Sequence, residues 1–562
     1  MTNTLKKHFL LLVILLIATC LHLYKLGQIP KILNPDEASI AYNALLLKET
    51  GKDEWGKHWP LVLDAFGDQK LIGYPALTVL SFQIFGYSDW AVKIPTVIAG
   101  SVLIILIYLL ELKLGHSQKR ATVSAALIAV IPVFFFYSRV AFEAMVALSY
   151  FLGAFLLLLE SGKKEEPKTV VVLNIFAGIL SLLALLTYNS PAILFPFLLL
   201  AVIIDRGVLN FKKWVGIISL LGLIWVSFLL YFLPLTIQKS KITLFGDETT
   251  LNEFNTYRSH LSASTRSLVG NKYVFYADKM LIGYAKSWSP AFLMNNVGGH
   301  PWHTVPGFGY IYWSVYFFGL IGILTKVFFV LRDLKGEARK KKLSVFKLLG
   351  QSRFSQTREI SVFLLFIFSL TPVIITVNAP QATRSLLFFF LWTYYAAFGL
   401  LVISRVIQIF IEHFLSTKIF WIKTEIGSRV ILGILFCIVL FEAGNYLSFY
   451  FGTYSTSDKL QSAFQPGFDT FIKQVDDNNQ GKPLAIVDER GFNYILLAWY
   501  LKLQPNFFFS TVKKQLPDKI NFKYGEQVGR YHFIAKPIDR KPSEKTVLEW
   551  SYADNKWDVL NY

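Results

Sequence analysis

The sequence predicts a polytopic α-helical membrane protein with a small soluble α/β domain at its C-terminus. Of its 562 residues, 54% are hydrophobic and only 17% are charged, whereas soluble domains carry about 25% charged residues. Apolar runs recur along the chain, and many have the roughly 20 residues with which a helix crosses a hydrocarbon core about 30 Å thick. The composition becomes polar after Asn445. These three observations exclude an ordinary cytosolic enzyme.

Eleven membrane spans are expected, and the first covers residues 9–26. An alternative for this run is a signal peptide, or a lipoprotein signal through Cys20, but no small-residue cleavage site follows it. Residues 71–86 are apolar but short and contain Pro75, so we expect a helix embedded from the external side; the total is about 11 to 13 transmembrane helices. The later spans are expected at residues 92–113, 120–138, 141–160, 168–187, 190–205, 213–234, 311–331, 360–377, 385–406 and 429–450.

Basic residues gather in alternate links between these spans. Lys113, Lys119 and Arg120 mark one such link, and the stretch at residues 332–358 marks another. The positive-inside rule makes these links cytoplasmic, which places the N-terminus inside and the C-terminal domain outside a multi-pass cell-membrane protein. A net charge of +19 could also indicate nucleic-acid binding, but no nucleic-acid motif accompanies the basic stretch, so contact with inner-leaflet lipid is favoured.

Two domains are therefore expected: a transmembrane module at residues 1–450, with external loops at 27–91 and 235–310, and an extracytoplasmic α/β domain at residues 451–562. In the second domain, strands are expected at 483–488, 531–535 and 547–552, with a helix at 492–503. It has neither a phosphate-binding loop nor a nucleophile elbow. Cys20 and Cys437 lie in apolar runs and predict neither a disulfide framework nor a zinc site.

The first charged motif at the external boundary contains Asp36 and Glu37. Asn34 can cap a helix whose first turn contains Pro35, with both carboxylates complementing the helix dipole. Two carboxylates at a helix start near the lipid surface can also supply a general base or hold a divalent cation. Both interpretations stay open at this point.

Three cations also lie in the external links. Lys70 lies in an external link, where the positive-inside rule disfavours lysine. It therefore either binds an anion such as a lipid phosphate or extends along apolar surface towards water. Arg139 and Glu143 are four residues apart and form either a helical ion pair or part of a site. Arg384, at another external helix start, likewise has either a structural role or a place in a site.

His300 and His303 invite a metal-site interpretation. Pro301 between them makes a regular helix unfavourable, and no spacing fixes both imidazoles on one ion. A loop turn with aromatic anchoring at the membrane is the alternative. Together, the external motifs suggest cations that hold a lipid phosphate and a carboxylate that activates an acceptor hydroxyl.

Several of these motifs resemble the lipid-carrier-dependent glycosyltransferases of the GT-C fold. The shared features are an Asp-Glu pair in a long first external loop, an acidic-x-Lys element before the next apolar segment, the run at residues 89–100, and Ser138-Arg139 with Glu143. Within this fold they resemble the bacterial protein O-mannosyltransferase-like family, glycosyltransferase family 39, which is related to the aminoarabinose transferase of lipid A. The resemblance covers roughly residues 1–450. Residues 303–307 and 464–467 also look like that group.

The resemblance implies that Asp36 is the catalytic carboxylate, with Glu37 in support. It implies that Lys70 binds the carrier phosphate and that Arg139 and Glu143 line the donor site, to which Arg384 is added as an external arginine. The implied reaction is inverting transfer of a sugar, hexosyl or pentosyl in type, from a polyprenyl-phosphate donor to a protein, lipid or envelope-glycan acceptor at the external face. No nucleotide sugar and no nucleic acid take part.

Departures from the family pattern limit what can be transferred. Lys70 is followed by Leu71 and Ile72 rather than by two prolines, Gln69 stands where the aminoarabinose branch has an acid, and Lys93 replaces an arginine. A divalent cation therefore stays open, with the metal unknown, and so does the identity of the donor sugar.

Two other classes of protein remain as alternatives. A transporter would bury ionisable residues near mid-span or break helices in symmetry-related halves, but Glu111, Lys113, Asp205 and Glu442 lie near span ends and no internal repeat is evident. A non-catalytic scaffold for the external tail gives no reason for charged motifs in several separate links.

Overall fold

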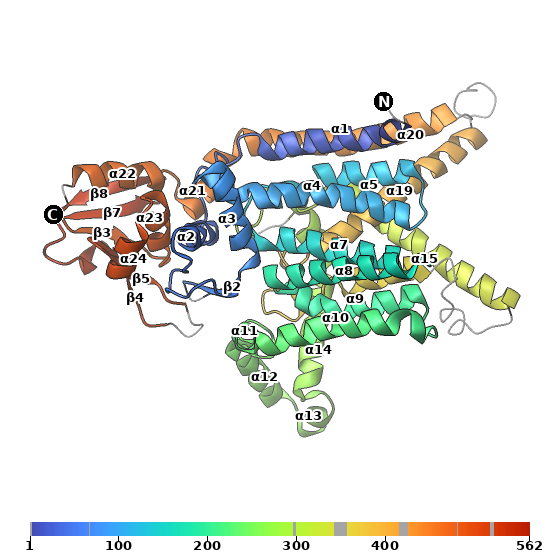
Figure 1. The fold of residues 1–562 in the computed structure, drawn as a ribbon, viewed down its shortest axis with the longest axis horizontal. Coiled ribbons are helices and arrows are strands. Elements are labelled where there is room, and N and C mark those ends of the chain that lie inside the picture. Colours follow the sequence, from blue (N-terminus) through green and yellow to red (C-terminus); the bar gives the residue numbers. More distant parts are fainter. Residues whose placement is uncertain are drawn as a thin grey trace.

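The computed structural model describes residues 3–66, 68–295, 299–341, 357–414, 425–479, 481–517 and 522–562. Long helices form a bundle, and a sheet domain lies beyond one end of it (Figure 1). The helices that cover the predicted spans are α1 (Asn3–Leu23), α4 (Asp89–Lys113), α5 (Gln118–Val130), α6 (Pro132–Tyr137), α7 (Glu143–Ser161), α8 (Pro167–Thr187), α9 (Ser190–Arg206), α10 (Phe211–Tyr231), α15 (Trp313–Lys341), α17 (Thr357–Phe368), α18 (Thr371–Ile374), α19 (Leu386–Phe414) and α20 (Glu425–Phe451).

Every predicted span coincides with helical structure, which confirms the predicted fold class. Within the described part of the chain, eight helical segments are long and apolar enough to cross a membrane: α4, α7, α8, α10, α15, α17 with α18, α19 and α20. The other predicted spans fall on shorter elements. Part of the basic stretch at 332–358, together with Lys418 and Lys423, lies outside the described residues.

The predicted span at residues 120–138 is interrupted rather than continuous. Ile131 adopts an extended conformation, with φ −63° and ψ 133°, between α5 and α6. Pro132 explains this break because a proline disfavours helical geometry in the residue before it. The apolar segment here is therefore two short helices of 13 and 6 residues.

The predicted embedded helix at 71–86 is α3 (Gly73–Phe85), which has 13 residues. At 1.5 Å per residue it is about 20 Å long, too short to cross the hydrocarbon core. It packs against the end of α8, where a Cβ atom on Gly73 would lie 2.3 Å from the Thr187 hydroxyl oxygen. Glycine is therefore needed at this contact.

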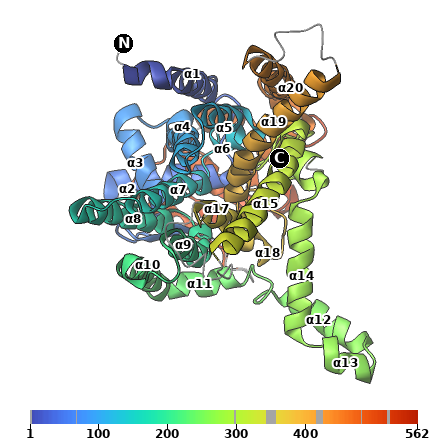
Figure 2. The ribbon, with the colours of Figure 1, turned by 90° about the vertical axis from the view of Figure 1, so that its right-hand side faces the viewer.

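The links at the sheet-domain end carry further elements. Helix α2 (Pro35–Thr50) and the hairpin of β1 (Val62–Ala65) and β2 (Asp68–Leu71) lie with α3 between the bundle and the sheet domain (Figure 1). A helical arm projects sideways from the bundle (Figure 2). It consists of α11 (Leu233–Ser240), α12 (Glu248–His260), α13 (Ala263–Val269) and α14 (Lys272–Ser287), and a short π-helical turn (Ala291–Asn295) follows it.

The C-terminal domain is a six-stranded mixed sheet with helices packed on it. The strand order is β4-β5-β6-β3-β7-β8, and the fully buried central strand β3 is parallel to both β6 and β7. The strands are β3 (Leu484–Val487), β4 (Lys513–Lys514), β5 (Gly525–Val528), β6 (Tyr531–Ile534), β7 (Thr546–Ser551) and β8 (Lys556–Asn561); the helices are α21 (Asp458–Phe464), α22 (Phe468–Asn478), α23 (Asn493–Tyr500) and α24 (Pro505–Thr511), with 3₁₀ turns at Tyr454–Thr456 and Pro537–Asp539. The three predicted strands and the predicted helix are β3, β6, β7 and α23.

Direct hydrogen bonds attach this domain to the start of α4 and to the link before α2. Trp499 Nε1 donates to Asp89 Oδ1 at 2.7 Å, and the Tyr500 hydroxyl donates to Asp89 Oδ2 at 3.0 Å. The Tyr500 oxygen in turn accepts a hydrogen bond from the backbone N–H of Leu33 at 2.9 Å. The C-terminal domain therefore fixes the chain immediately before α2.

The opposite end of the bundle is held by a buried ionic cluster around His116. This imidazole lies between Glu111 (Nδ1–Oε2, 2.6 Å) and Glu359 (Nε2–Oε1, 2.7 Å), while Arg120 also pairs with Glu111 at 2.9 Å. Burial lowers the pKa of His116, but hydrogen bonds to the two carboxylates outweigh this effect and raise the pKa above its ordinary value of 6.5.

This cluster predicts a pH-dependent contribution to stability. A histidine whose pKa is higher in the folded state stabilises the protein fully below pH 6.5 and loses that contribution as the pH rises through the folded-state value. We therefore expect His116→Gln to lower the melting temperature of the detergent-solubilised protein more at pH 6 than at pH 9. The same substitution at exposed His58 is the control, and an equal loss at both pH values for His116→Gln would contradict the prediction.

Candidate active site

The position of Asp36 is set by the cap of α2. Asn34 Oδ1 accepts a hydrogen bond from the Glu37 N–H at 3.0 Å, and Glu37 Oε2 accepts one from the Asn34 N–H at 3.1 Å. This reciprocal capping box, with Pro35 in the first turn, is the arrangement predicted for a helix start. It holds Asp36 in the first turn of α2, where its side chain is 27% exposed.

Glu37 faces a different environment from its neighbour. Its side chain is fully buried and pairs with the equally buried Lys93 of α4 at 3.5 Å. Its Oε1 also accepts a hydrogen bond from the Ala141 N–H at 2.8 Å. Glu37 therefore joins α2 to α4 and to the link before α7, and these contacts make it a positioning residue for Asp36 rather than a second exposed carboxylate.

Lys70 lies at the centre of the charged cluster. Its Nζ is 2.7 Å from Asp36 Oδ1, 3.5 Å from Asp68 Oδ2 and 3.9 Å from Glu143 Oε1. Asp68 and Lys70 share one face of β2 because side chains alternate along a strand, and Glu143 is the first residue of α7. Asp68 also pairs with Lys239 of α11. We call these five residues the Lys70 cluster.

Mutual attraction keeps Lys70 and Asp68 in their charged forms. Burial lowers the pKa of Lys70, but the carboxylates of Asp36, Glu143 and Asp68 outweigh it and raise the pKa above its ordinary value. Burial likewise raises the pKa of Asp68, yet Lys239 and Lys70 bring it below its ordinary value. Lys70 therefore stays an ammonium ion at any physiological pH and can meet an anion.

Arg384, Tyr188 and His303 border the same cluster. The Tyr188 hydroxyl contacts Arg384. Burial raises the pKa of Tyr188 above its ordinary value, Glu143 raises it further, and Arg384 and Lys70 oppose the shift. Burial lowers the pKa of His303 to about 4, although Asp36 opposes the shift, so the imidazole is neutral at neutral pH. Arg384 is half-buried and forms no ion pair with any residue that the structure describes.

Arg139 is placed apart from these groups. It is fully buried, and five hydrogen bonds from its guanidinium go to the carbonyls of Leu21, His22, Tyr24 and Lys25 and to the Tyr450 hydroxyl. Because α1 ends at Leu23, Arg139 satisfies carbonyls that the helix end leaves open. The alternative of a helical ion pair with Glu143 does not apply, since α7 begins only at Glu143.

The histidine motif is part of a packed loop. His303 stacks on Phe142 with ring centroids 4.9 Å apart, and Trp302 Nε1 donates to the Ala463 carbonyl at 3.0 Å. Among the described residues, no group of three or more His, Cys, Asp or Glu side chains could hold a metal ion. The carboxylates of Asp36 and Asp68 bind lysines instead, so the residues present do not fit a resident divalent cation.

The structure brings together Asp36, Lys70 and Glu143, which the sequence suggested as parts of one site. The sequence had suggested no role for Asp68, Lys239 or Tyr188. The available signal for Lys239 was the same as for Lys70: a lysine in a link predicted to be external, where the positive-inside rule disfavours it. Tyr188 gave no signal because one tyrosine at a span end is also typical of a membrane interface.

Comparison with known proteins agrees with the predicted resemblance. Residues 70–232 match the profile of the family described as dolichyl-phosphate-mannose-protein mannosyltransferase. This segment includes Lys70, Arg139 and Glu143, whereas Asp36 and Arg384 lie outside it. No match was found among curated protein sequences.

Solved structures give the fold. The oligosaccharyltransferase of Archaeoglobus fulgidus in its apo form has a TM-score of 0.50 and 13% sequence identity, covering 96% of this chain and 69% of that chain. AglB of the same organism, in complex with an inhibitory peptide and a dolichol-phosphate, has a TM-score of 0.49 and 13% sequence identity; the match covers 97% of this chain and 70% of that chain. ArnT of Cupriavidus metallidurans bound to undecaprenyl phosphate has a TM-score of 0.47 and 11% sequence identity; the match covers 87% of this chain and 84% of that chain. The likeness to the apo oligosaccharyltransferase confirms the GT-C type of fold.

The contacts of Glu37 predict a loss of stability when its charge is removed. Glu37→Gln leaves the Lys93 ammonium buried without a counter-ion, which costs roughly 3 to 5 kcal/mol in comparable buried pairs. We expect a clearly lower melting temperature in detergent. The double variant Glu37→Gln/Lys93→Met removes both charges and should recover part of the loss; a double variant no more stable than the single one would contradict this interpretation.

Proposed function

We propose that this protein is a membrane glycosyltransferase that uses a polyprenyl-phosphate-linked sugar and modifies an acceptor at the external face of the membrane. The observation that carries the proposal is the Lys70 cluster, in which a buried ammonium ion lies within 4 Å of carboxylates from α2, β2 and α7. The family profile matched by residues 70–232 supports the same class of reaction.

The donor phosphate is bound by cations of the cluster. Lys70 is the central contact because it is already desolvated and can donate charge-assisted hydrogen bonds to phosphate oxygens. Arg384, half-buried beside Tyr188, is suited to hold a second oxygen through its planar fork of N–H donors. The phosphate then competes with Asp36 for Lys70, so that donor binding releases the Asp36 carboxylate for chemistry.

Asp36 acts as the general base. It accepts the proton of an acceptor hydroxyl as that oxygen attacks the anomeric carbon of the sugar. The bond from this carbon to the phosphate oxygen breaks at the same time, and polyprenyl phosphate leaves with the electron pair, stabilised by Lys70 and Arg384. A single displacement inverts the configuration at the anomeric carbon. The transferred group is a hexosyl or pentosyl unit, and the acceptor is a protein, a lipid or an envelope glycan.

The proposed orientation follows from the charge distribution. Helix α2 and strand β2, which carry Asp36 and Lys70, lie at the same end of the bundle as the C-terminal domain (Figure 1). The described basic residues Lys113, Lys163 and Arg206 meet at the far ends of α4, α7 and α9. The positive-inside rule then puts the cluster and this domain outside and the N-terminus in the cytoplasm. A transporter is less well supported, because ionic clusters such as Glu111 with His116 lie at helix ends rather than at mid-span.

The assignment of Asp36 predicts that Asp36→Asn lowers turnover by at least about a hundredfold, because positioned general bases typically contribute factors of 10² to 10⁴. Purified protein in lipid nanodiscs would be assayed with radiolabelled polyprenyl-phosphate sugars and an envelope extract as acceptor. An unchanged melting temperature would show that the capping box of α2 is intact. Full turnover by the variant would exclude Asp36 as the base.

The assignment of Lys70 predicts a different kinetic change. Lys70→Ala should raise the KM for the donor more than it lowers kcat, since it removes a contact to the bound phosphate. Lys57, exposed in the same external link, offers the matched control Lys57→Ala, for which both parameters should stay unchanged. A donor KM that does not move in Lys70→Ala would argue against phosphate binding by this residue.

A further inference from the structure

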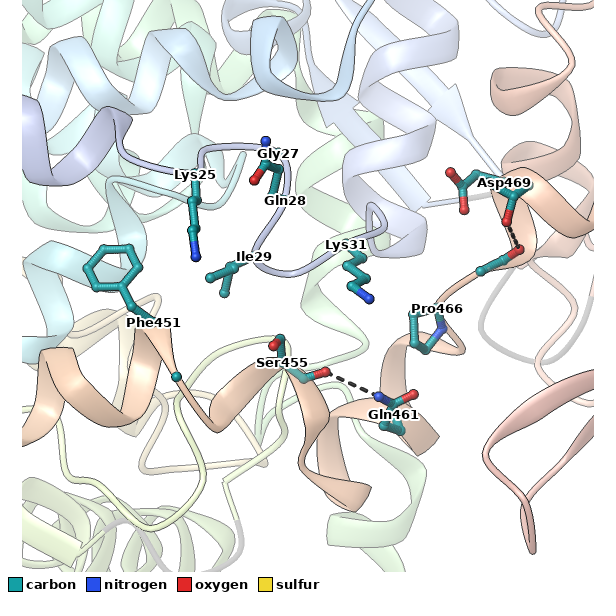
Figure 3. Close-up of a pocket in the computed structure, with 13 residues that line it drawn as sticks. Lys25, Gly27, Gln28, Ile29, Lys31, Phe451, Ser455, Gln461, Pro466 and Asp469 are labelled. Carbon is teal, nitrogen blue, oxygen red and sulfur yellow. Dashed lines mark hydrogen bonds between the residues drawn. The ribbon is translucent and has the colours of Figure 1, made fainter.

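A cavity lies away from the Lys70 cluster, where the α1–α2 link faces the segment that follows α20 (Figure 3). It measures about 760 Å³, large enough for a lipid headgroup or a small oligosaccharide. Residues 25–31 form one wall and residues 451–470 the other. None of the residues of the Lys70 cluster lines it.

The first wall is fixed by residues that the proposed reaction does not use. The Arg139 guanidinium donates hydrogen bonds to the Tyr24 carbonyl at 2.8 Å and to the Lys25 carbonyl at 3.3 Å. The Tyr450 hydroxyl donates to the Ile29 carbonyl at 3.2 Å. Lys25 has a φ of 52°, a conformation that its side chain alone would not favour. The backbone of this wall is therefore set before any ligand arrives.

The second wall contains the motif at residues 464–467 that resembles the bacterial family. Phe464 and Gln465 are buried, and the Gln465 carbonyl accepts a hydrogen bond from Trp557 Nε1 of β8 at 3.1 Å. Pro466 and Gly467 face the cavity instead, with Gly467 at a φ of 88° that favours glycine. The motif therefore ties this wall to the C-terminal sheet.

The lining of the cavity favours an anion that carries further polar groups. Lys25 and Lys31 extend from the first wall towards the space between the walls (Figure 3), and neither forms an ion pair with the residues that the structure describes. Asp469 is the one carboxylate among the lining residues, and burial raises its pKa. The two ammonium groups therefore outweigh it, and Gln461 and Thr470 add neutral polar groups.

The surroundings of the cavity favour an amphiphile. Leu23, the last residue of α1, is 44% exposed, and Tyr24, which follows it directly before this wall, is 54% exposed. Further apolar side chains of α1, among them Leu16 and Ile17, are also exposed. A ligand with its charged head between Lys25 and Lys31 can therefore lay an acyl chain along Leu23 and Tyr24 without leaving the bilayer.

We propose that this cavity is a second anion site, which binds a phosphate mono- or diester through Lys25 and Lys31, with the headgroup of a membrane lipid as its favoured source. The site requires neither Asp36 nor Lys70, so it stands or fails independently of the proposed transfer reaction. Arg139 acts here as a positioning residue, because it holds the wall that carries Lys25.

The test is binding of short-chain lipids to the purified full-length protein, measured by native mass spectrometry and by calorimetric titration. The probes are dioctanoyl phosphatidylglycerol, dioctanoyl phosphatidylcholine and inorganic phosphate. Lys25→Gln/Lys31→Gln should weaken phosphatidylglycerol binding about tenfold or more, and Lys25→Glu/Lys31→Glu should weaken it further. The matched control is Lys52→Gln/Lys57→Gln, which removes the same charge from exposed positions of the neighbouring link between α2 and β1 and should bind like wild type.

The probes separate the sources of the phosphate. Tight binding of phosphatidylglycerol with weak binding of inorganic phosphate supports a lipid headgroup, whereas equal competition by inorganic phosphate supports the same site with a soluble ligand. Because Lys25 and Lys31 are exposed, we expect unchanged melting temperatures for the glutamine variants. Equal affinities for wild type and Lys25→Gln/Lys31→Gln, or an equal loss in the control variant, would overturn the proposal.

Discussion

The end of the bundle that meets the C-terminal domain depends on the ion pair between Glu37 and Lys93. Both side chains are completely buried, and a buried charge is tolerated only when it is paired and hydrogen-bonded. Glu37 meets this condition through Lys93, the Ala141 N–H and the cap of α2. Helix α2 therefore cannot rotate or shift without exposing or unpairing a charge, and this constraint fixes the direction in which the adjacent Asp36 points.

Two successive carboxylates thus divide two tasks. Glu37 points inwards and holds three segments together, while Asp36 points towards the hairpin of β1 and β2, where Lys70 meets it. The sequence suggested both a capped helix start and a functional carboxylate for this motif, and in the structure the two coexist on neighbouring residues. Adjacent positions on a helix point about 100° apart, which is why one residue can be committed to structure and the next left for a ligand.

The fold was more predictable than the site. Span positions follow from apolar runs that are local in the sequence, and even the break at Pro132 has a local cause. The pairings within the Lys70 cluster do not follow from local sequence, because Asp36 and Glu143, which meet Lys70, and Lys239, which meets Asp68, come from three elements far apart in the chain. Sequence could indicate that each charge at the outer boundary needs a partner, but not which charge would meet which.

Arg139 shows why the same reasoning gave a less specific answer at another position. An arginine at the outer boundary is expected to bind an anion, yet a helix C-terminus presents the same electrostatic attraction through its open carbonyls. The end of α1 lies against Arg139 and takes its hydrogen bonds. Lys25 and Lys31 are left on the wall that Arg139 supports, facing a cavity rather than a helix end. The buried cation thus holds the wall in place, and the exposed cations of that wall are the ones that meet the anion.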